Sequence, residues 1–334
     1  MNPNEVSHKN GNIFGLPHTR DEAEIILIPS IIDTTVSYGD GTAQGPSQIV
    51  EASYQIDLFE PTNIDLYKKG IFMYPVKEEE IELNRQFREK AAYLIEKLEN
   101  GEAFTNDDIQ IQNEINAFCD NHREKIKTHV LYEIESAKKV GMIGGDHSSS
   151  LGALQAFAHE YESFGVLQID AHADLRDAYE GFAFSHASVM YEALKIPQIT
   201  KLVQVGIRDI CHDEVNLIDA HPDRIHTFFD RDIKHHSYKG TSWHQTCLKI
   251  IQTLPEFVYV SFDIDGLDPK LCPNTGTPVP GGLEFEQACY LIQQIKESGR
   301  KIIGFDVVEV SNGPDSDWDA NVGMRLIYRI CALL

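Results

Sequence analysis

The stretch Phe164-Gly-Val-Leu-Gln-Ile-Asp-Ala-His-Ala-Asp174 decides the fold of this chain. It begins as a continuous apolar run, which is typical of a strand buried on both faces of a sheet. It ends in three potential metal ligands at alternate positions, Asp170, His172 and Asp174. Because side chains two residues apart on a strand point to the same side, we expect these three to converge. In open parallel sheets, ligands bind at this carboxyl edge of the strands.

Two further strand ends share this pattern. The run Val140-Gly-Met-Ile-Gly-Gly-Asp-His147 ends in an aspartate and a histidine, and Phe257-Val-Tyr-Val-Ser-Phe-Asp-Ile-Asp265 ends in two aspartates. One such end alone is equally well explained as a polar strand end that accepts hydrogen bonds from loop amides. Three of them favour a metal site, because carboxylates in an apolar interior must be paired or bound to metal.

Strands and helices are predicted to alternate along most of the chain. Strands are predicted at Ala23–Pro29, Val140–Ile143, Gly165–Ile169, Leu202–Ile207, Ile225–Phe229, Val258–Ile264 and Ile302–Val308. Helices are predicted at Ser47–Tyr54, Ser149–His159, Ala187–Ala193, Trp243–Leu254, Glu284–Glu297 and Ala320–Ala332. This alternation indicates an α/β fold in which helices cover both faces of a central parallel sheet.

The segment 76–139 interrupts this pattern with charged, amphipathic sequence. Three helical stretches are predicted within it, at Glu78–Asn100, Asn106–Phe118 and His122–Lys139, because their apolar residues recur at helical spacing. Since no Pro/Gly-rich linker separates this segment from the strand after it, we expect residues 1–334 to form a single domain. The segment 76–139 is then a helical insertion, and residues 1–22 are a loose N-terminal arm.

The charge of the chain restricts its partners. It carries 52 acidic and 29 basic side chains and a net charge of −23. A surface this acidic argues against nucleic acid as a partner. A negative field favours cationic substrates and metal ions, although the same charge is explained at least as well by solubility.

Cysteine usage and hydropathy indicate the cellular location of the protein. The six cysteines are scattered, with no Cys-x-x-Cys pair, so we expect reduced thiols and a cytoplasmic enzyme. No run of about 18 or more apolar residues predicts a membrane span. The polar segment Met1–Arg20 lacks the apolar core of a signal peptide.

The three strand ends supply six candidate ligands with two imidazoles and four carboxylates: His147, Asp170, His172, Asp174, Asp263 and Asp265. They are too many for one tetrahedral zinc site. They suit two divalent ions about 3.5–4 Å apart, with a water of lowered pKa between them. Oxygen-rich ligation with little imidazole favours manganese over zinc. Such a centre is suited to hydrolysis at a carbon that is otherwise a poor electrophile.

These motifs resemble the signatures of the ureohydrolase (arginase–agmatinase) family. They stand here as Gly144-Gly-Asp-His-Ser148, Gln168-Ile-Asp-Ala-His-Ala-Asp-Leu-Arg176 and Ser261-Phe-Asp-Ile-Asp-Gly-Leu-Asp-Pro269. The resemblance implies a three-layer α/β/α sandwich, two Mn²⁺ ions per chain and a homotrimer or homohexamer. It implies that one ion is held by His147, Asp170, Asp174 and Asp263. The other is then held by Asp170, His172, Asp263 and Asp265, so that Asp170 and Asp263 bridge the two.

Further residues carry over from the same resemblance. His186 matches a proton-shuttling histidine, and Glu309 matches a carboxylate that binds the substrate guanidinium, for which a bidentate carboxylate is suited. Asp146, Asp268 and Thr277 are expected to support the ligands and their loops. The pair His235-His236 is expected to be an exposed loop pair rather than a metal site.

The loops indicate a substrate without an α-carboxylate. The segment Leu175–Phe184 is too short for an arginine clamp, and Ile210 and Cys211 stand where arginases carry an acid that meets the α-amino group. The leading hypothesis is hydrolysis of agmatine, a small cationic guanidino substrate, to putrescine and urea, with Tyr179 and Glu180 near its tail. The alternatives are guanidinobutyrate, guanidine, formiminoglutamate or arginine as substrate, or an inactive scaffold stabilised by metal.

Overall fold

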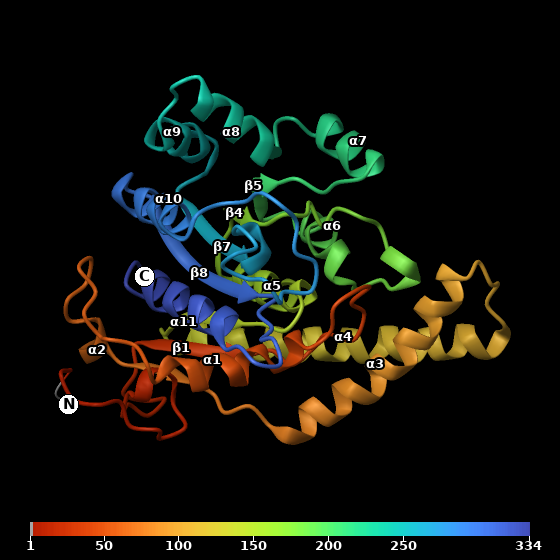
Figure 1. The fold of residues 1–334 in the computed structure, drawn as a ribbon, viewed down its shortest axis with the longest axis horizontal. Coiled ribbons are helices and arrows are strands. Elements are labelled where there is room, and N and C mark those ends of the chain that lie inside the picture. The colour runs from red at the N-terminus through yellow and green to blue at the C-terminus, as the bar shows by residue number, and fades with distance from the viewer. Residues whose placement is uncertain (1–2) are drawn as a thin grey trace.

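The computed structural model describes residues 3–334 and builds them around one parallel sheet (Figure 1). Its strands are β1 (Ile25–Pro29), β2 (Ile71–Met73), β3 (Lys139–Ile143), β4 (Phe164–Ile169), β5 (Ile199–Ile207), β6 (Ile225–Phe229), β7 (Phe257–Asp263) and β8 (Lys301–Val308). Their spatial order is β2-β1-β3-β8-β7-β4-β5-β6, and every pairing is parallel. The order places β3, β8, β7 and β4 side by side, so the segments after these four strands meet at one edge.

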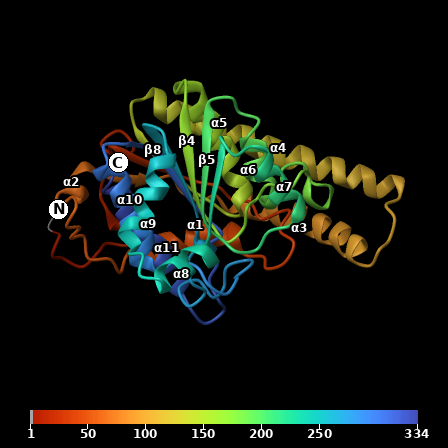
Figure 2. The same ribbon diagram turned by 90° about the horizontal axis from the view of Figure 1, so that it is seen from above.

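Helices cover both faces of the sheet, as Figure 2 shows from above. They are α1 (Gly45–Ser53), α2 (Leu66–Lys69), α3 (Glu78–Glu99), α4 (Asn106–Glu135), α5 (Ser150–Glu160), α6 (Val189–Ala193), α7 (His212–Ala220), α8 (Asp230–Tyr238), α9 (Trp243–Thr253), α10 (Phe285–Glu297) and α11 (Trp318–Cys331). One buried cluster joins the sheet to α1, α9, α10 and α11, and another joins it to α4, α5 and α6. The expected three-layer α/β/α sandwich is confirmed.

Strand side chains divide between these two clusters by alternation. In β4, Val166 packs in the cluster of α4, α5 and α6, whereas Leu167 packs in the cluster of α1, α9, α10 and α11. Every residue of β4 is buried. This is the reason that the strand reads as a continuous apolar run in the sequence, since both of its faces are covered.

The helical insertion differs from its prediction in one respect. The stretches Asn106–Phe118 and His122–Lys139 form a single helix, α4, which spans Asn106–Glu135. The residues between them, Cys-Asp-Asn, include no proline or glycine, so the backbone hydrogen bonds continue through them. A capping box between Thr105 and Asp108 fixes the start of α4.

Helices α3 and α4 extend to one side of the molecule as a hairpin (Figure 1). Their own buried cluster includes Leu94 and Ile115 and also takes in Ile32 and Phe182 from loops at the carboxyl edge of the sheet. The rings of Phe87 and Phe118 stack 4.2 Å apart between the two helices. Because this hairpin packs on the loops of the sheet, we propose that it is part of one domain.

The N-terminal arm is anchored, contrary to the expectation of a loose segment. Ile13, Phe14 and Leu16 are fully buried, and the ring of Phe14 lies 4.9 Å from that of Tyr328 on α11. Residues 1–2 of the predicted arm lie outside the described residues. The amphipathic signal of a short segment such as Ile13–Leu16 is too weak to be recognised from sequence.

One strand and three α-helices of residues 3–334 were not predicted: the short β2 and α2, and the longer helices α7 and α8. His235 and His236 lie in the last turn of α8, so the expected loop pair is part of a helix. In the part of the chain described here, no helix has the length and apolar character needed to cross a membrane.

Candidate metal centre

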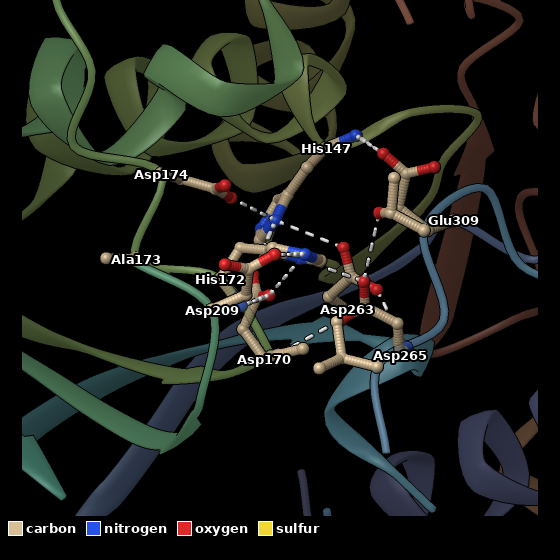
Figure 3. Close-up of polar contacts among 12 residues, drawn as sticks. His147, Asp170, His172, Ala173, Asp174, Asp209, Asp263, Asp265 and Glu309 are labelled. Atoms are coloured by element: carbon tan, nitrogen blue, oxygen red, sulfur yellow. Dashed lines mark hydrogen bonds and ion pairs between the residues drawn. The ribbon is translucent and has the colours of Figure 1, made fainter. Parts of the chain in front are cut away.

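The six candidate ligands meet at the carboxyl edge of the sheet (Figure 3). Asp170 follows β4 directly, Asp263 ends β7, and His147 begins the short 3₁₀ helix His147–Ser149 after β3. These three residues come from separate strands of one sheet but lie up to 116 residues apart in sequence. The parallel arrangement therefore brings together the three strand ends that the sequence singled out.

The imidazole of His147 faces three carboxylates. Its Nδ1 atom lies 2.8 Å from Oδ2 of Asp174, 3.0 Å from Oδ2 of Asp170 and 3.4 Å from Oδ2 of Asp263. His147, Asp170 and Asp174 form one group whose ligand atoms are close enough to hold a single ion. All three residues are buried.

A second group forms around His172. Its Nδ1 atom lies 3.0 Å from Oδ2 of Asp265 and 3.6 Å from Oδ1 of Asp170. Asp170, His172 and Asp265 are again close enough to hold one ion, so Asp170 belongs to both groups. Asp263 lies beside both groups, because its Oδ2 atom is 3.4 Å from Nδ1 of His147 and its Oδ1 atom accepts a 2.8 Å hydrogen bond from the main-chain N–H of Asp265.

Hydrogen bonds to neighbouring groups orient these side chains. The Asp170 carboxylate accepts hydrogen bonds from the Gln168 side chain at 2.8 Å and from the main-chain N–H of His172 at 2.6 Å. Oδ1 of Asp265 accepts a 3.0 Å bond from Ala171 N. Each of these contacts leaves another carboxylate oxygen, or another lone pair, directed at the centre.

A buried aspartate on β8 orients the Ser261 hydroxyl that contacts Nε2 of His147. Oδ1 of Asp306 accepts bonds from the Ser261 hydroxyl at 3.0 Å and from Phe262 N at 3.2 Å. The Ser261 hydroxyl, with its proton directed at Asp306, accepts from Nε2–H of His147 at 2.9 Å. This leaves the Nδ1 lone pair of His147 to face the carboxylates. Asp306 was not predicted as a site residue, although an aspartate inside an apolar strand is a usable signal.

The donor set fits divalent cations. Burial, together with the charge of Asp170, raises the pKa of Asp174 to about 7. Burial also raises the pKa of Asp263 well above its usual range, with further contributions from Asp265 and Asp170. Nδ1 of His147 is buried and has no hydrogen-bond partner despite its carboxylate neighbours. A cation bound among these groups offsets the repulsion between the carboxylates and gives Nδ1 of His147 a partner.

His186 lies at the start of the short 3₁₀ helix His186–Ser188, beside the centre. It lines a cavity of about 140 Å³ together with His172, Asp174 and Thr277. Burial, together with the neighbouring His172, lowers the pKa of His186 to about 3. The imidazole is therefore neutral at physiological pH. A larger cavity of about 840 Å³ between α3 and α4 has none of the candidate ligands in its lining, so the chemistry of the smaller one identifies the site.

Glu309 directly follows β8 and has a left-handed backbone conformation, with φ of 62°. Its main-chain N–H donates to the carbonyl of Gly145, and its Oε1 atom accepts from the main-chain N–H of His147 at 2.9 Å. A side chain on Gly276 would place its Cβ atom 3.6 Å from Oε2 of Glu309. Non-glycine residues in this conformation are strained and concentrate at functional sites.

The expected supporting residues take different positions. Oδ1 of Asp146 accepts a 3.0 Å bond from Ser148 N and so shapes the turn that carries His147. The Thr277 hydroxyl donates to Oδ2 of Asp265 at 3.4 Å. Asp268 instead accepts a bond from Lys270 N at 3.1 Å, where it shapes its own loop.

Tyr179 lines the same cavity as His186, and their rings are 6.2 Å apart in an edge-on arrangement. The guanidinium of Arg176 stacks 4.6 Å from the centre of the Tyr179 ring. Glu180 lines a second cavity, of about 410 Å³, whose lining also includes Arg176 and Tyr179. Four further polar residues line the His186 cavity and were not predicted as site residues: Ser37, Arg176, Asp209 and Glu214.

Comparisons with known proteins agree with this geometry. The model of the arginase family matches residues 23–332. The chain is 29% identical over 331 residues to an N(1)-aminopropylagmatine ureohydrolase of Thermus thermophilus, covering 96% of this chain and 94% of that protein. It is 25% identical over 308 residues to an agmatinase of Bacillus anthracis, covering 90% and 88%. Its fold matches the crystal structure of an agmatine ureohydrolase of Thermoplasma volcanium with a TM-score of 0.74 at 22% identity, covering 98% and 94%.

Proposed function

This chain belongs to the arginase family, and we propose that it hydrolyses a guanidino compound with a cationic tail, with agmatine as the leading substrate. Its homologues in the family are hydrolases that act on guanidino compounds. The products from agmatine are putrescine and urea. The observation that carries the proposal is that Glu309 and His186 lie beside two ligand groups that share Asp170.

We propose that the two groups hold two Mn²⁺ ions per chain. His147, Asp170, Asp174 and Asp263 are assigned to one ion, and Asp170, His172, Asp263 and Asp265 to the other. When bound, divalent ions lower the pKa of water and so supply a nucleophile near neutral pH. The carboxylate-rich donor set favours manganese over zinc.

Glu309 is assigned to orient the guanidinium. One of its oxygens is occupied by the N–H of His147, which leaves the other to accept from the substrate. A charge-assisted hydrogen bond of this kind holds a planar cation in one orientation. The reacting carbon is thereby held against the ligand groups rather than free to turn.

His186 is assigned to proton transfer. Its imidazole is kept neutral by burial and lines the cavity beside the ligand groups. We assign to it the transfer of the proton that leaves the attacking water to the departing amine. General acid–base catalysis of this type requires a group that changes its protonation state within the site. Tyr179 packs against the ring and restricts its orientation.

The charges around the cavity support the proposal that the substrate has a cationic tail. Asp209 is exposed at its margin, and the Leu175–Phe184 loop offers no set of donors for a carboxylate beyond Arg176. Arg176 is itself stacked on Tyr179 and lies 3.9 Å from the buried carboxylate of Glu214. Ile210 and Cys211 directly precede helix α7, and neither is an acid that could meet the α-amino group of arginine.

A second candidate substrate is N(1)-aminopropylagmatine, which has a longer cationic tail. The name of the Thermus thermophilus relative points to it. So does the second cavity, whose lining includes the carboxylates of Asp177, Glu180 and Asp213. A further ammonium group on the tail is complementary to such a lining.

The test is urea release from a panel of substrates by one preparation supplied with Mn²⁺. Agmatine and N(1)-aminopropylagmatine are expected to be hydrolysed faster than arginine, guanidinobutyrate and guanidine. Faster turnover of arginine than of agmatine would overturn the argument from the loops. No urea from any of these compounds would favour formiminoglutamate, tested by formamide release, or an inactive scaffold.

A further inference from the structure

We infer that helix α3 of the insertion positions one wall of the substrate site. Asn84 on this helix holds the loop that forms this wall of the His186 cavity. This inference rests on the proposed function, since it takes that cavity as the place where the substrate binds. The loop comprises residues 33–43, and we call it the wall loop. It lies between β1 and helix α1 in the chain.

Both the oxygen and the nitrogen of the Asn84 amide form hydrogen bonds with the start of the wall loop. Its Oδ1 atom accepts from Asp33 N at 3.0 Å and from the Thr34 hydroxyl at 2.8 Å. Its Nδ2 atom donates to Oδ1 of Asp33 at 2.6 Å. All three residues are buried, with exposed fractions of 3% for Asn84, 4% for Asp33 and 0% for Thr34. Unsatisfied groups at this depth are costly, so the bonds define one arrangement.

Asp33 also accepts hydrogen bonds from the other end of the wall loop. Its Oδ2 atom accepts from Gly41 N at 2.9 Å and from Ala43 N at 3.2 Å. One carboxylate therefore holds the end of the loop with one oxygen and faces Asn84 with the other. Ser37 lies between these two anchored ends and lines the cavity with His172 and His186.

The wall loop is also held from the opposite side. Gly39 N donates to the carbonyl of Gly276 at 3.2 Å, and a Cβ atom on Gly39 would lie only 2.8 Å from that oxygen. Thr277, the next residue after Gly276, lines the cavity. The loop is therefore wedged between α3 and the segment of Gly276, and release of the α3 contact is expected to let Ser37 move.

A reciprocal exchange of the two side chains tests this inference. Asn84→Asp alone opposes two carboxylate oxygens at a contact of 2.6 Å and should open the wall loop. Asp33→Asn combined with Asn84→Asp restores every bond. The amide placed at position 33 donates to residue 84, and its oxygen accepts from Gly41 N and Ala43 N. The carboxylate placed at position 84 accepts from the N–H of residue 33 and from Thr34. The net charge is unchanged by the exchange.

The measurements are hydrogen–deuterium exchange of the wall loop and steady-state kinetics with the best substrate of the panel. Asn84→Asp should speed exchange at Gly41 and Ala43 and raise KM about tenfold, as expected for loss of about one buried hydrogen bond, while kcat changes by less than about threefold. The exchanged pair should return both quantities to within about threefold of the wild type. A KM effect without a large kcat effect separates a wall from a catalytic group.

The matched control is Arg85→Ala on the same helix, where Arg85 is exposed and pairs with Glu82 and Glu89. It should leave both quantities unchanged. If the exchanged pair is as impaired as the single variant, or if the wall loop exchanges at the wild-type rate in Asn84→Asp, the inference is wrong. Hydrogen exchange needs no turnover, so the holding of the loop is decided even if the wild type hydrolyses none of the panel.

Discussion

The main-chain N–H of His147 donates a hydrogen bond of 2.9 Å to Oε1 of Glu309. His147 follows β3 and Glu309 follows β8, and these strands are neighbours with Ile143 paired to Val307. The bond joins a candidate metal ligand to the carboxylate assigned to the guanidinium. The pairing of β3 with β8 sets the spacing of the two residues, and the hydrogen bond holds the Glu309 carboxylate against the main chain of His147. Orientation of a substrate requires this rigidity.

Asp170 should be needed for both ions. It belongs to both ligand groups, whereas Asp174 and Asp265 each belong to one. We expect Asp170→Asn to lose both ions and nearly all activity, and Asp174→Asn to lose one. Elemental analysis of the purified variants measures this directly. Loss of a single ion from Asp170→Asn would show that the two groups do not share this carboxylate, and Asp263→Ala then tests the other residue assigned as a bridge.

Glu309→Gln should impair catalysis but not metal content. The glutamine oxygen can still accept from His147 N, but the charge that faces the guanidinium is lost. A hydrogen bond to a charged group contributes roughly 1.5–3 kcal/mol, so kcat/KM should fall roughly 10- to 150-fold. Metal content is measured on the same preparation. A variant that keeps the wild-type kcat/KM would exclude Glu309 from substrate orientation.

His186→Ala should lower kcat on the order of 100-fold, the lower end for general acid–base catalysis. Its two ions should remain bound, because His186 is outside both ligand groups. Since burial holds the pKa of His186 near 3, the histidine should not limit activity on the acid side above about pH 4. The pH profiles of kcat for the wild type and the variant check this. An unchanged kcat in the variant would contradict the shuttle assignment.

His122 should make the protein less stable in acid. Burial lowers its pKa to about 4, while an unfolded histidine titrates near about pH 6.5. Between these values the unfolded state binds more protons than the folded state, so the free energy of unfolding falls as pH falls from about 6.5 to about 4. We expect His122 to account for on the order of 2 kcal/mol of this loss.

The measurement compares urea unfolding of the wild type and His122→Gln at pH 7 and pH 4.5, at one protein concentration. Glutamine can retain a contact with the Ser30 hydroxyl, which lies 2.7 Å from Nε2 of His122. The variant should lose less stability than the wild type between the two pH values. Equal losses would show that His122 already carries the same charge in the folded and unfolded states.

The sequence alone determined the layered fold and the candidate ligands, because both depend on local patterns. A strand buried on both faces must be apolar throughout, as Phe164–Ile169 is, and a charged residue directly after it lies at the carboxyl edge of the sheet. Three such ends converge only if their strands run parallel, and the alternation of strands with helices already required that.

Contacts between distant segments needed the tertiary structure. Asp306 follows Ser261 by 45 residues and His147 by 159, and only the adjacency of β7 and β8 brings its carboxylate to the Ser261 hydroxyl. Asn84 lies in a charged helical stretch and has no sequence signal that marks it as buried. Its partners Asp33 and Thr34 are reached because α3 packs against the wall loop.

Helix boundaries and the ordering of the arm were also decided by tertiary packing. The joint between the two predicted helices near Cys119 stays helical, since Cys119 is buried against Ile115 and Leu94. Phe14 is ordered by the ring of Tyr328, 314 residues later in the chain. Local propensity determines which segments can be helices or strands, whereas burial against distant residues decides which of them are extended, joined or held in place.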